Sequence, residues 1–164
     1  MSRCPSAKDT YFSEQLLNWF DKYGRKDLPW QQDKTAYRVW VSEIMLQQTQ
    51  TTRVAQKYLQ FLRKFPTMQK LASASRELVL REWQGLGYNR RALALQKAAQ
   101  KVVKEYKGKI PKDISALEDF PGIGPYTARA ISIFSFNTPV ACIETNIRRV
   151  FIHHFFADEN NVED

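Results

Sequence analysis

The stretch that decides the fold runs from Leu117 to Val150 and reads LEDFPGIGPYTARAISIFSFNTPVACIETNIRRV. Within it, the five residues 121–125 (PGIGP) lie between two segments whose apolar residues recur at helical spacing. The two glycines of this run permit a tight turn, because glycine adopts backbone angles that other residues avoid. The pattern predicts a helix-hairpin-helix over residues 117–131.

The predicted turn is suited to an anion. Gly122 and Gly124 would expose main-chain N–H groups at the start of the next helix, where the helix dipole favours negative charge. A DNA phosphate fits such a place, with Thr127 and Arg129 beside it. An ordinary connection between two helices has the same glycine-rich pattern, so the turn alone leaves both interpretations open.

Composition indicates a globular, basic protein. The 164 residues, 43% of them apolar and 13% aromatic, suit one domain of ordinary size or two small lobes sharing a core. Lys and Arg total 25 against 17 Asp and Glu, which gives a formal charge of +8. This excess is compatible with a polyanionic partner, although many basic proteins bind no nucleic acid.

Cysteine content and hydropathy limit the cofactors and the compartment. The two cysteines, Cys4 and Cys142, are too few for a disulfide framework or a four-cysteine iron–sulfur cluster, so we expect no cofactor in this chain. No apolar run reaches membrane-spanning length, and the first residues lack the core of a signal peptide. We expect a soluble, intracellular protein with no membrane partner.

The rest of the chain predicts helices and no strands, hence the all-α class. Residues 25–37, which include Pro29 and Trp30, are predicted to be an extended connection. Ser75 is the predicted cap of the segment that follows it. The longer helices are expected over residues 11–23, 37–46, 51–65, 76–84 and 91–106, with shorter turns over 67–73 and after residue 111.

Glu43 is a candidate acid. It lies in an almost wholly apolar segment, Tyr37–Leu46 (YRVWVSEIML). A carboxylate there either finds a partner or keeps its proton near neutral pH, and a protonated carboxyl in an apolar pocket is a good general acid. Alternatively, Glu43 faces water on the polar side of an amphipathic helix. Residues 47–49 (QQT) follow with side chains able to hydrogen-bond base edges.

A second candidate region is the glycine-flanked loop 85–91 (GLGYNRR), which is predicted to present an aromatic residue and two cations. An exposed Tyr88 would stack on bases or wedge between them, an interaction that tolerates many sequences. Equally, Tyr88 packs down onto the protein. The spacing does not decide between these alternatives.

Four motifs in this order and spacing, VSEIMLQQTQ, WQGLGYNRRALAL, LEDFPGIGPYTARAI and IETNIRRV, resemble the helix-hairpin-helix DNA glycosylases, most closely the MutY-type adenine glycosylases. The resemblance runs from about Leu28 to Val150. It implies a base-excision repair enzyme that flips its target nucleotide into a pocket between two helical lobes. It also implies that residues 28–136 form one lobe, while residues 1–27 and 137–164 belong to a second, truncated one.

The resemblance assigns roles residue by residue. Glu43 matches the acid that protonates adenine, and Trp30 and Leu46 match residues lining the base pocket. Gln48 matches the wedge that fills the vacated stack, and Tyr88 the residue inserted beside the opposite base.

Tyr126 stands where the lyase-competent branch of the superfamily carries a Schiff-base lysine. A phenol cannot form an imine with the sugar, so a monofunctional glycosylase is expected. Gly122, Gly124 and Thr127 are expected to contact DNA. Arg148 is expected to contact phosphate, although a solvated charge explains it nearly as well.

Glu144 departs from the family, which places an aspartate there. The extra methylene matters because a displacement on the order of 1 Å can cost about a hundredfold in rate. We predict that Glu144 takes the role of the aspartate, with Asn146 beside it.

The end of the chain also departs from the family, whose members continue for several more helices. A fragment or truncated gene is therefore expected, with Phe151, Ile152, Phe155 and Phe156 as the inner face of a helix whose partners are partly missing. The resemblance further implies a monovalent cation at the hairpin carbonyls, no other metal, and a monomer.

Three functions follow from the resemblance. The first is removal of adenine opposite 8-oxoguanine or guanine in mismatched double-stranded DNA. The second is removal of thymine or uracil opposite guanine, and the third is DNA binding without catalysis. Any of them places the protein in the cytoplasm with the nucleoid if it is bacterial.

Overall fold

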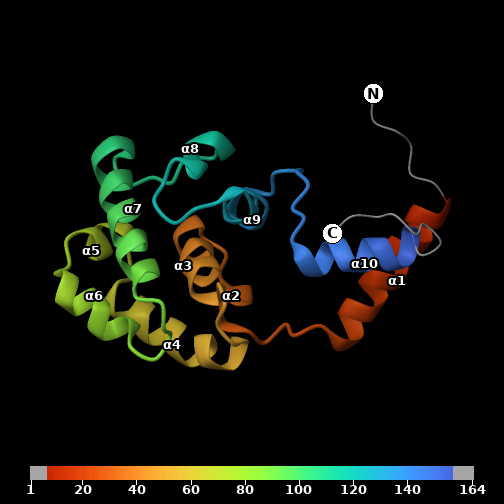
Figure 1. Ribbon diagram of the computed structural model, residues 1–164, viewed down its shortest axis with the longest axis horizontal. Helices are drawn as coiled ribbons and strands as arrows, with labels where there is room; N and C mark the ends of the chain where they lie inside the picture. Colours follow the sequence, from red (N-terminus) through yellow and green to blue (C-terminus); the bar gives the residue numbers. More distant parts are fainter. Residues whose placement is uncertain (1–6, 157–164) are drawn as a thin grey trace.

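The computed structural model describes residues 7–156, and the regular structure within that range is wholly helical. The predicted all-α class is therefore confirmed. Most helices gather in a bundle, from which the first and the last stand apart (Figure 1). The helices are α1 (Ala7–Tyr23), α2 (Pro29–Gln32), α3 (Ala36–Leu46), α4 (Thr51–Lys64), α5 (Met68–Ala72), α6 (Arg76–Trp83), α7 (Arg90–Tyr106), α8 (Ile114–Glu118), α9 (Pro125–Phe136) and α10 (Thr145–Phe155).

Helix α3 is the centre of the bundle and contacts α2, α4, α7 and α9. Trp40, Val41 and Met45 on this helix have no exposed surface. The Trp40 ring lies 5.4 Å from the ring of Phe120, which precedes the hairpin turn. Because α3 is packed on several sides, its last turn is held rigidly against the rest of the bundle.

Two local predictions have different outcomes. Ser75 caps α6 as expected, since its Oγ accepts a hydrogen bond from the Leu78 N–H at 3.2 Å. The extended connection over residues 25–37 is wrong in part, because Pro29–Gln32 forms the short helix α2. Proline is favoured at the first helical position, where its fixed φ suits the helix and its missing N–H costs nothing.

The hairpin predicted from the glycine-rich turn joins α8 to α9. Leu117, Phe120 and Ile123 anchor it, each at most 6% exposed. Gly122 has φ +82°, and a Cβ added there would lie 2.9 Å from the Cβ of Ala94 on α7. Glycine is needed at this position both for the left-handed backbone and for the close approach of the hairpin to α7.

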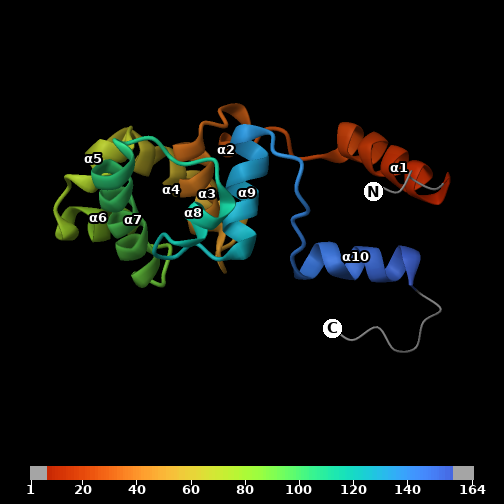
Figure 2. The same ribbon diagram turned by 90° about the horizontal axis from the view of Figure 1, so that it is seen from above.

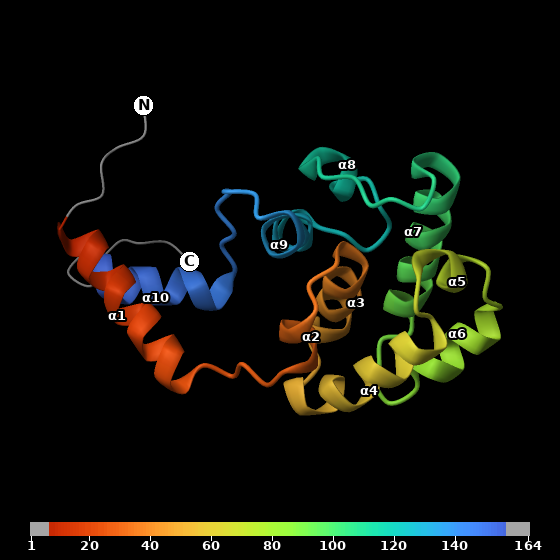
Figure 3. The same cartoon turned by 180° about the vertical axis from the view of Figure 1, so that it is seen from behind.

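Helices α1 and α10 lie beside each other, away from the bundle, and two extended connections lead to them (Figures 2 and 3). The ring of Phe12 lies 5.7 Å from Phe151 and 5.2 Å from both His154 and Phe155. Phe156, predicted on the inner face, is 43% exposed. The division into lobes at residues 28 and 137 stays a prediction.

Between residues 7 and 156, no helix is both long enough and apolar enough to cross a membrane.

Candidate active site

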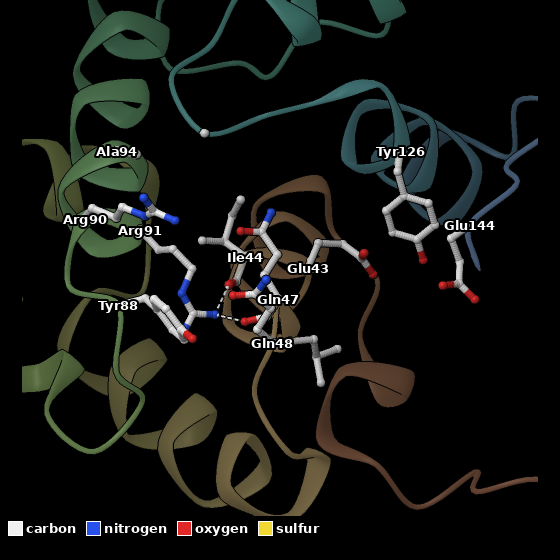
Figure 4. A pocket seen from close by; sticks show the side chains of 12 residues that line it. Glu43, Ile44, Gln47, Gln48, Tyr88, Arg90, Arg91, Ala94, Tyr126 and Glu144 are labelled. Carbon is white, nitrogen blue, oxygen red and sulfur yellow. Dashed lines mark hydrogen bonds between the residues drawn. The ribbon is translucent and has the colours of Figure 1, made fainter. Parts of the chain in front are cut away.

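A cavity of about 770 Å³ opens between the end of α3, the start of α7, the hairpin and the start of α10 (Figure 4). Its size falls in the range of small-molecule pockets. Seven residues predicted for the site line its wall: Glu43, Leu46, Gln48, Tyr88, Gly122, Tyr126 and Glu144. Residues up to 101 positions apart in the sequence, Glu43 and Glu144, thus share one cavity.

Glu43 is half-buried on the last turns of α3, between Ser42 and Ile44, which are each 2% exposed. Its carboxyl extends into the cavity on the side of Tyr126 (Figure 4). Burial raises the pKa of Glu43 to about 7. A carboxyl with such a pKa holds a proton in a large fraction of molecules at neutral pH and can donate it to a bound group.

Tyr126, in the first turn of α9, brings its phenol close to both glutamates. Burial raises the pKa of the Tyr126 phenol to about 12, and the negative charges of Glu43 and Glu144 act in the same direction. The phenol therefore stays protonated at neutral pH and is available as a hydrogen-bond donor. Figure 4 shows the three side chains on the same side of the cavity.

Glu144 is the N-cap of α10. Its Oε1 accepts hydrogen bonds from the main-chain N–H groups of Asn146 at 2.9 Å and Ile147 at 3.1 Å. Its Oε2 accepts from Nδ2 of Asn146 at 3.4 Å. Shorter residues such as Ser, Thr, Asp and Asn are the usual caps, so the extra methylene is accommodated by folding the side chain back onto the helix. The carboxylate is fixed at the positive end of the helix dipole, in the cavity wall.

Gln48 and Tyr88 flank the mouth of the cavity in unusual backbone conformations, with φ of +54° and +46°. Both side chains are exposed, Tyr88 to 55%. Left-handed angles are uncommon for residues other than glycine and persist only where the surrounding structure imposes them. Of the two alternatives for Tyr88, the structure therefore shows the exposed one.

The other predicted site residues lie outside the cavity wall formed by the described residues. Trp30 packs edge-on against Tyr58, with 5.7 Å between ring centroids. Thr127 is buried, and its hydroxyl accepts a hydrogen bond from Gln47 Nε2 at 3.4 Å, which links α9 to the end of α3. Gly124 is the N-cap of α9, and Arg148 lies on α10, one turn after the Glu144 cap. Asn146 is connected to the site by the hydrogen bond that its Nδ2 donates to Glu144.

Arg91 lies in a different environment from the one predicted. Arg91 was expected to be an exposed cation in the loop, but it is 8% exposed, and its guanidinium donates hydrogen bonds to main-chain carbonyls. The apolar spacing of α7 gave a weak signal, since Arg91 lies four residues before Leu95 on the inner stripe of that helix. Spacing alone does not tell which of two neighbouring arginines turns inward.

The monovalent cation expected at the hairpin carbonyls stays a prediction. The Asp119 carbonyl accepts a hydrogen bond from the Lys101 ammonium at 3.2 Å. The Phe120 carbonyl accepts one from the Ile123 N–H at 3.1 Å. Each of these carbonyl oxygens keeps a second lone pair, and the chemistry proposed for the site uses no cation. Cys4 lies outside the described residues, and Cys142 is a half-buried free thiol.

Comparison with curated proteins gives relatives of similar sequence. The chain is 39% identical over 150 residues to an adenine DNA glycosylase of Buchnera aphidicola, and the match covers 92% of this chain and 43% of the relative. It is 43% identical over 153 residues to the adenine DNA glycosylase of Rattus norvegicus, covering 88% of this chain and 30% of the relative. The chain thus spans less than half the length of these relatives.

Comparison with solved structures gives the same fold. A thermostable thymine-DNA glycosylase superposes with a TM-score of 0.84 at 25% identity, covering 94% of this chain and 72% of that one. An endonuclease III in a non-covalent DNA complex superposes with a TM-score of 0.73 at 19% identity, covering 90% of this chain and 68% of that one, and this likeness concerns the fold alone. Residues 41–164 match the family described as HhH-GPD superfamily base excision DNA repair protein, which is more than half of the chain. The chain belongs to the HhH-GPD superfamily of base excision DNA repair proteins.

Proposed function

We propose that the protein is a DNA glycosylase that hydrolyses the N-glycosidic bond of adenine mispaired with 8-oxoguanine or guanine. One observation carries the proposal: Glu43, whose pKa burial raises to about 7, and Glu144, a carboxylate fixed by capping bonds, line the same cavity. Two carboxyl groups, one acid and one anion, are the usual means of breaking a glycosidic bond. The names of the relatives from Buchnera aphidicola and Rattus norvegicus support adenine as the base.

In the proposed mechanism the target nucleotide leaves the base stack and its base enters the cavity. The Glu43 carboxyl gives its proton to a ring nitrogen of the adenine. The bond between the base and C1′ then breaks, and its electron pair leaves with the neutral base. The positive charge that develops on the sugar is stabilised by the Glu144 carboxylate. A water molecule adds to C1′, and its proton passes to a carboxylate of the site.

Tyr126 supports hydrolysis without strand cleavage. A phenol whose pKa burial raises to about 12 stays neutral, donates a hydrogen bond and forms no imine with the sugar. We expect a monofunctional enzyme, from which borohydride traps no sugar adduct in high yield.

Mismatched double-stranded DNA is the proposed partner of a monomeric, intracellular protein, associated with the nucleoid if the source is bacterial. A formal charge of +8 favours a polyanion. Main-chain groups around Gly122 and Gly124, together with Arg148, are proposed for the phosphates. Gln48 and Tyr88 are proposed for the bases, because they are exposed at the cavity mouth.

Leu46, Trp30 and Thr127 are proposed to contribute to binding of the flipped base in different ways. Leu46 lines the cavity and is proposed to contact the base directly. Trp30 packs edge-on against Tyr58 and is half-buried, and it is proposed to contact the base with the part that stays exposed. Thr127 is proposed to act through Gln47, which its hydroxyl holds at the end of α3.

Removal of thymine or uracil opposite guanine is the second candidate. The superposition with a thermostable thymine-DNA glycosylase, at a TM-score of 0.84, favours it. Amides at Gln47 and Gln48 favour adenine instead, since an amide pairs well with the edge of an adenine base.

A gel assay on four duplexes, with A:8-oxoG, A:G, T:G and U:G mismatches, separates the candidates. Under single-turnover conditions, alkali-labile sites are expected on the adenine strand of the first two duplexes. Release from T:G or U:G alone would favour the second candidate. Binding to all four without base loss would favour a DNA-binding protein without catalysis, and Glu43→Gln serves as the inactive control.

A further inference from the structure

Arg91 lies where the end of α3 meets the loop before α7. It is 8% exposed, and its Nη1 donates hydrogen bonds to the carbonyls of Ile44 at 3.0 Å and Met45 at 3.2 Å. The same Nη1 donates to the carbonyl of Gln47, the residue immediately before Gln48. Figure 4 shows the guanidinium between the end of α3, at Ile44 and Gln47, and the ring of Tyr88. One nitrogen of Arg91 thus holds the last turn of α3.

The other terminal nitrogen of Arg91 holds the glycine-flanked loop. Its Nη2 donates to the carbonyls of Leu86 at 3.0 Å and Gly87 at 3.2 Å. It also donates to Oγ1 of Thr49 at 2.9 Å, on the first segment. A single cation therefore joins two segments that are about forty residues apart in the chain.

These two segments carry Gln48 and Tyr88, which flank the mouth of the cavity. Both residues have positive φ, +54° and +46°, and such angles persist only when neighbouring groups impose them. Two of the carbonyls that accept from Arg91 belong to the residues immediately before Gln48 and Tyr88, namely Gln47 and Gly87. The guanidinium carbon also lies 5.5 Å from the centre of the Tyr88 ring.

We propose that Arg91 is a positioning residue that fixes Gln48 and Tyr88 relative to each other across the mouth of the cavity. This inference rests on the proposed function only in assigning those two side chains to DNA. Arg91 is 8% exposed and lines the cavity wall, but its two terminal nitrogens are engaged by main-chain carbonyls and Thr49, so we expect it to act through these two segments. Only a planar guanidinium presents enough donors in a fixed fork to satisfy both segments, so lysine keeps the charge but not the geometry.

Hydrogen exchange of the free protein tests the positioning directly. In Arg91→Lys, the amides of residues 47–50 and 85–89 are expected to exchange about tenfold faster, as for the net loss of one or two hydrogen bonds. The interiors of α3 and α7 are expected to keep their protection. Arg76→Lys, a change at an exposed arginine on α6, is the matched control and should alter neither segment. Thr49→Val, which removes one partner of Nη2, is a milder variant with a smaller effect at the same amides.

A second measurement reports how far the target base is unstacked in the bound DNA. With 2-aminopurine next to the target base, Arg91→Lys is expected to bind the duplex with near wild-type affinity but to give a weaker unstacking signal. Single-turnover base release should fall about a hundredfold, as for displacements near 1 Å.

The two readouts separate this inference from the proposed function. If the wild-type protein releases no base from any duplex, the proposed function fails, and the exchange of the two segments still decides the role of Arg91. Unchanged exchange at both segments would overturn the inference. So would an equal increase throughout the bundle, because that result describes general destabilisation.

Discussion

The α2–α9 bundle and the α1–α10 pair are stabilised by different means. In the bundle, Trp40 and Phe61 have no exposed surface, whereas Trp19 and Leu17 on α1 are 58% and 63% exposed. The proposed site takes one carboxyl group from each region. Glu43 owes its raised pKa to burial beside a packed core, while Glu144 owes its position to three short-range capping bonds.

This difference shows that the two acids can be tuned separately. Burial sets the protonation of Glu43, so changes in bundle packing alter its pKa. Local hydrogen bonds set the position of Glu144, so changes at the start of α10 alter geometry and leave the bundle intact. Four experiments test that separation.

The largest effect is expected for Glu43→Gln, which removes the proton donor from the bundle side. General acid catalysis contributes up to about 10⁴-fold, and a loss near that limit is expected because the amide cannot protonate the base. Duplex affinity should stay close to wild type. Single-turnover release from an A:8-oxoG duplex measures the loss, and a rate within a few-fold of wild type would exclude Glu43 as the acid.

Glu144→Gln tests the carboxylate that comes from the α1–α10 pair. The amide still caps α10 through its oxygen but carries no charge to stabilise the sugar cation, so base release should fall by about 10³-fold. Glu144→Asp, the residue that the resemblance predicts at this position, is the matched comparison, since it keeps both charge and cap. Single-turnover rates that are equal for all three proteins would show that the carboxylate plays no part.

The contrast in packing is tested by two tryptophan replacements. Trp40→Ala removes a fully buried ring and should cost about 3–5 kcal/mol of unfolding free energy, whereas Trp19→Ala, at 58% exposure, should cost about 0.5 kcal/mol or less. Urea unfolding followed by circular dichroism measures both. Similar costs for the two variants would mean that α1 is more firmly packed than its exposure indicates.

The smallest effect concerns the pH dependence of stability. Burial raises the pKa of Glu43 from 4.5 to about 7. The folded state therefore holds this proton more tightly than the unfolded state, and the stability that this gives is fully present below pH 4.5 and is lost as pH rises through 7. At pH 8 the buried carboxylate is charged and opposes folding. Glu43→Gln should therefore stabilise the protein by on the order of 2 kcal/mol at pH 8 and by little at pH 5. Thermal unfolding at both pH values checks this, and an equal difference at both would contradict the role of burial.

Much of this architecture could be predicted from local pattern. The apolar spacing over residues 37–46 predicted α3, and the PGIGP run predicted the hairpin, because both signals are local in the chain. The family motifs named seven residues that line the cavity. The helix at Pro29–Gln32 was missed, since a single turn has no periodicity to detect.

The position of Arg91 could not be predicted for a different reason. Apart from the Thr49 hydroxyl, its partners are main-chain carbonyls of Ile44, Met45, Gln47, Leu86 and Gly87, and main-chain carbonyls leave no mark on the sequence. The cap formed by Glu144 was equally hidden, because glutamate is an unusual residue for that place. Tertiary contacts between side chain and backbone are the part that sequence patterns do not record.

The contact between Gly122 and Ala94 limits how this protein can evolve. A methyl group in the hairpin would collide with the α7 alanine at 2.9 Å, and it would also have to tolerate φ of +82°. Ala94→Gly would relieve the collision but not the backbone penalty of about 1–2 kcal/mol. A smaller residue at position 94 therefore does not make a larger residue at position 122 acceptable. Natural variation at Gly122 should be far rarer than at Ala94.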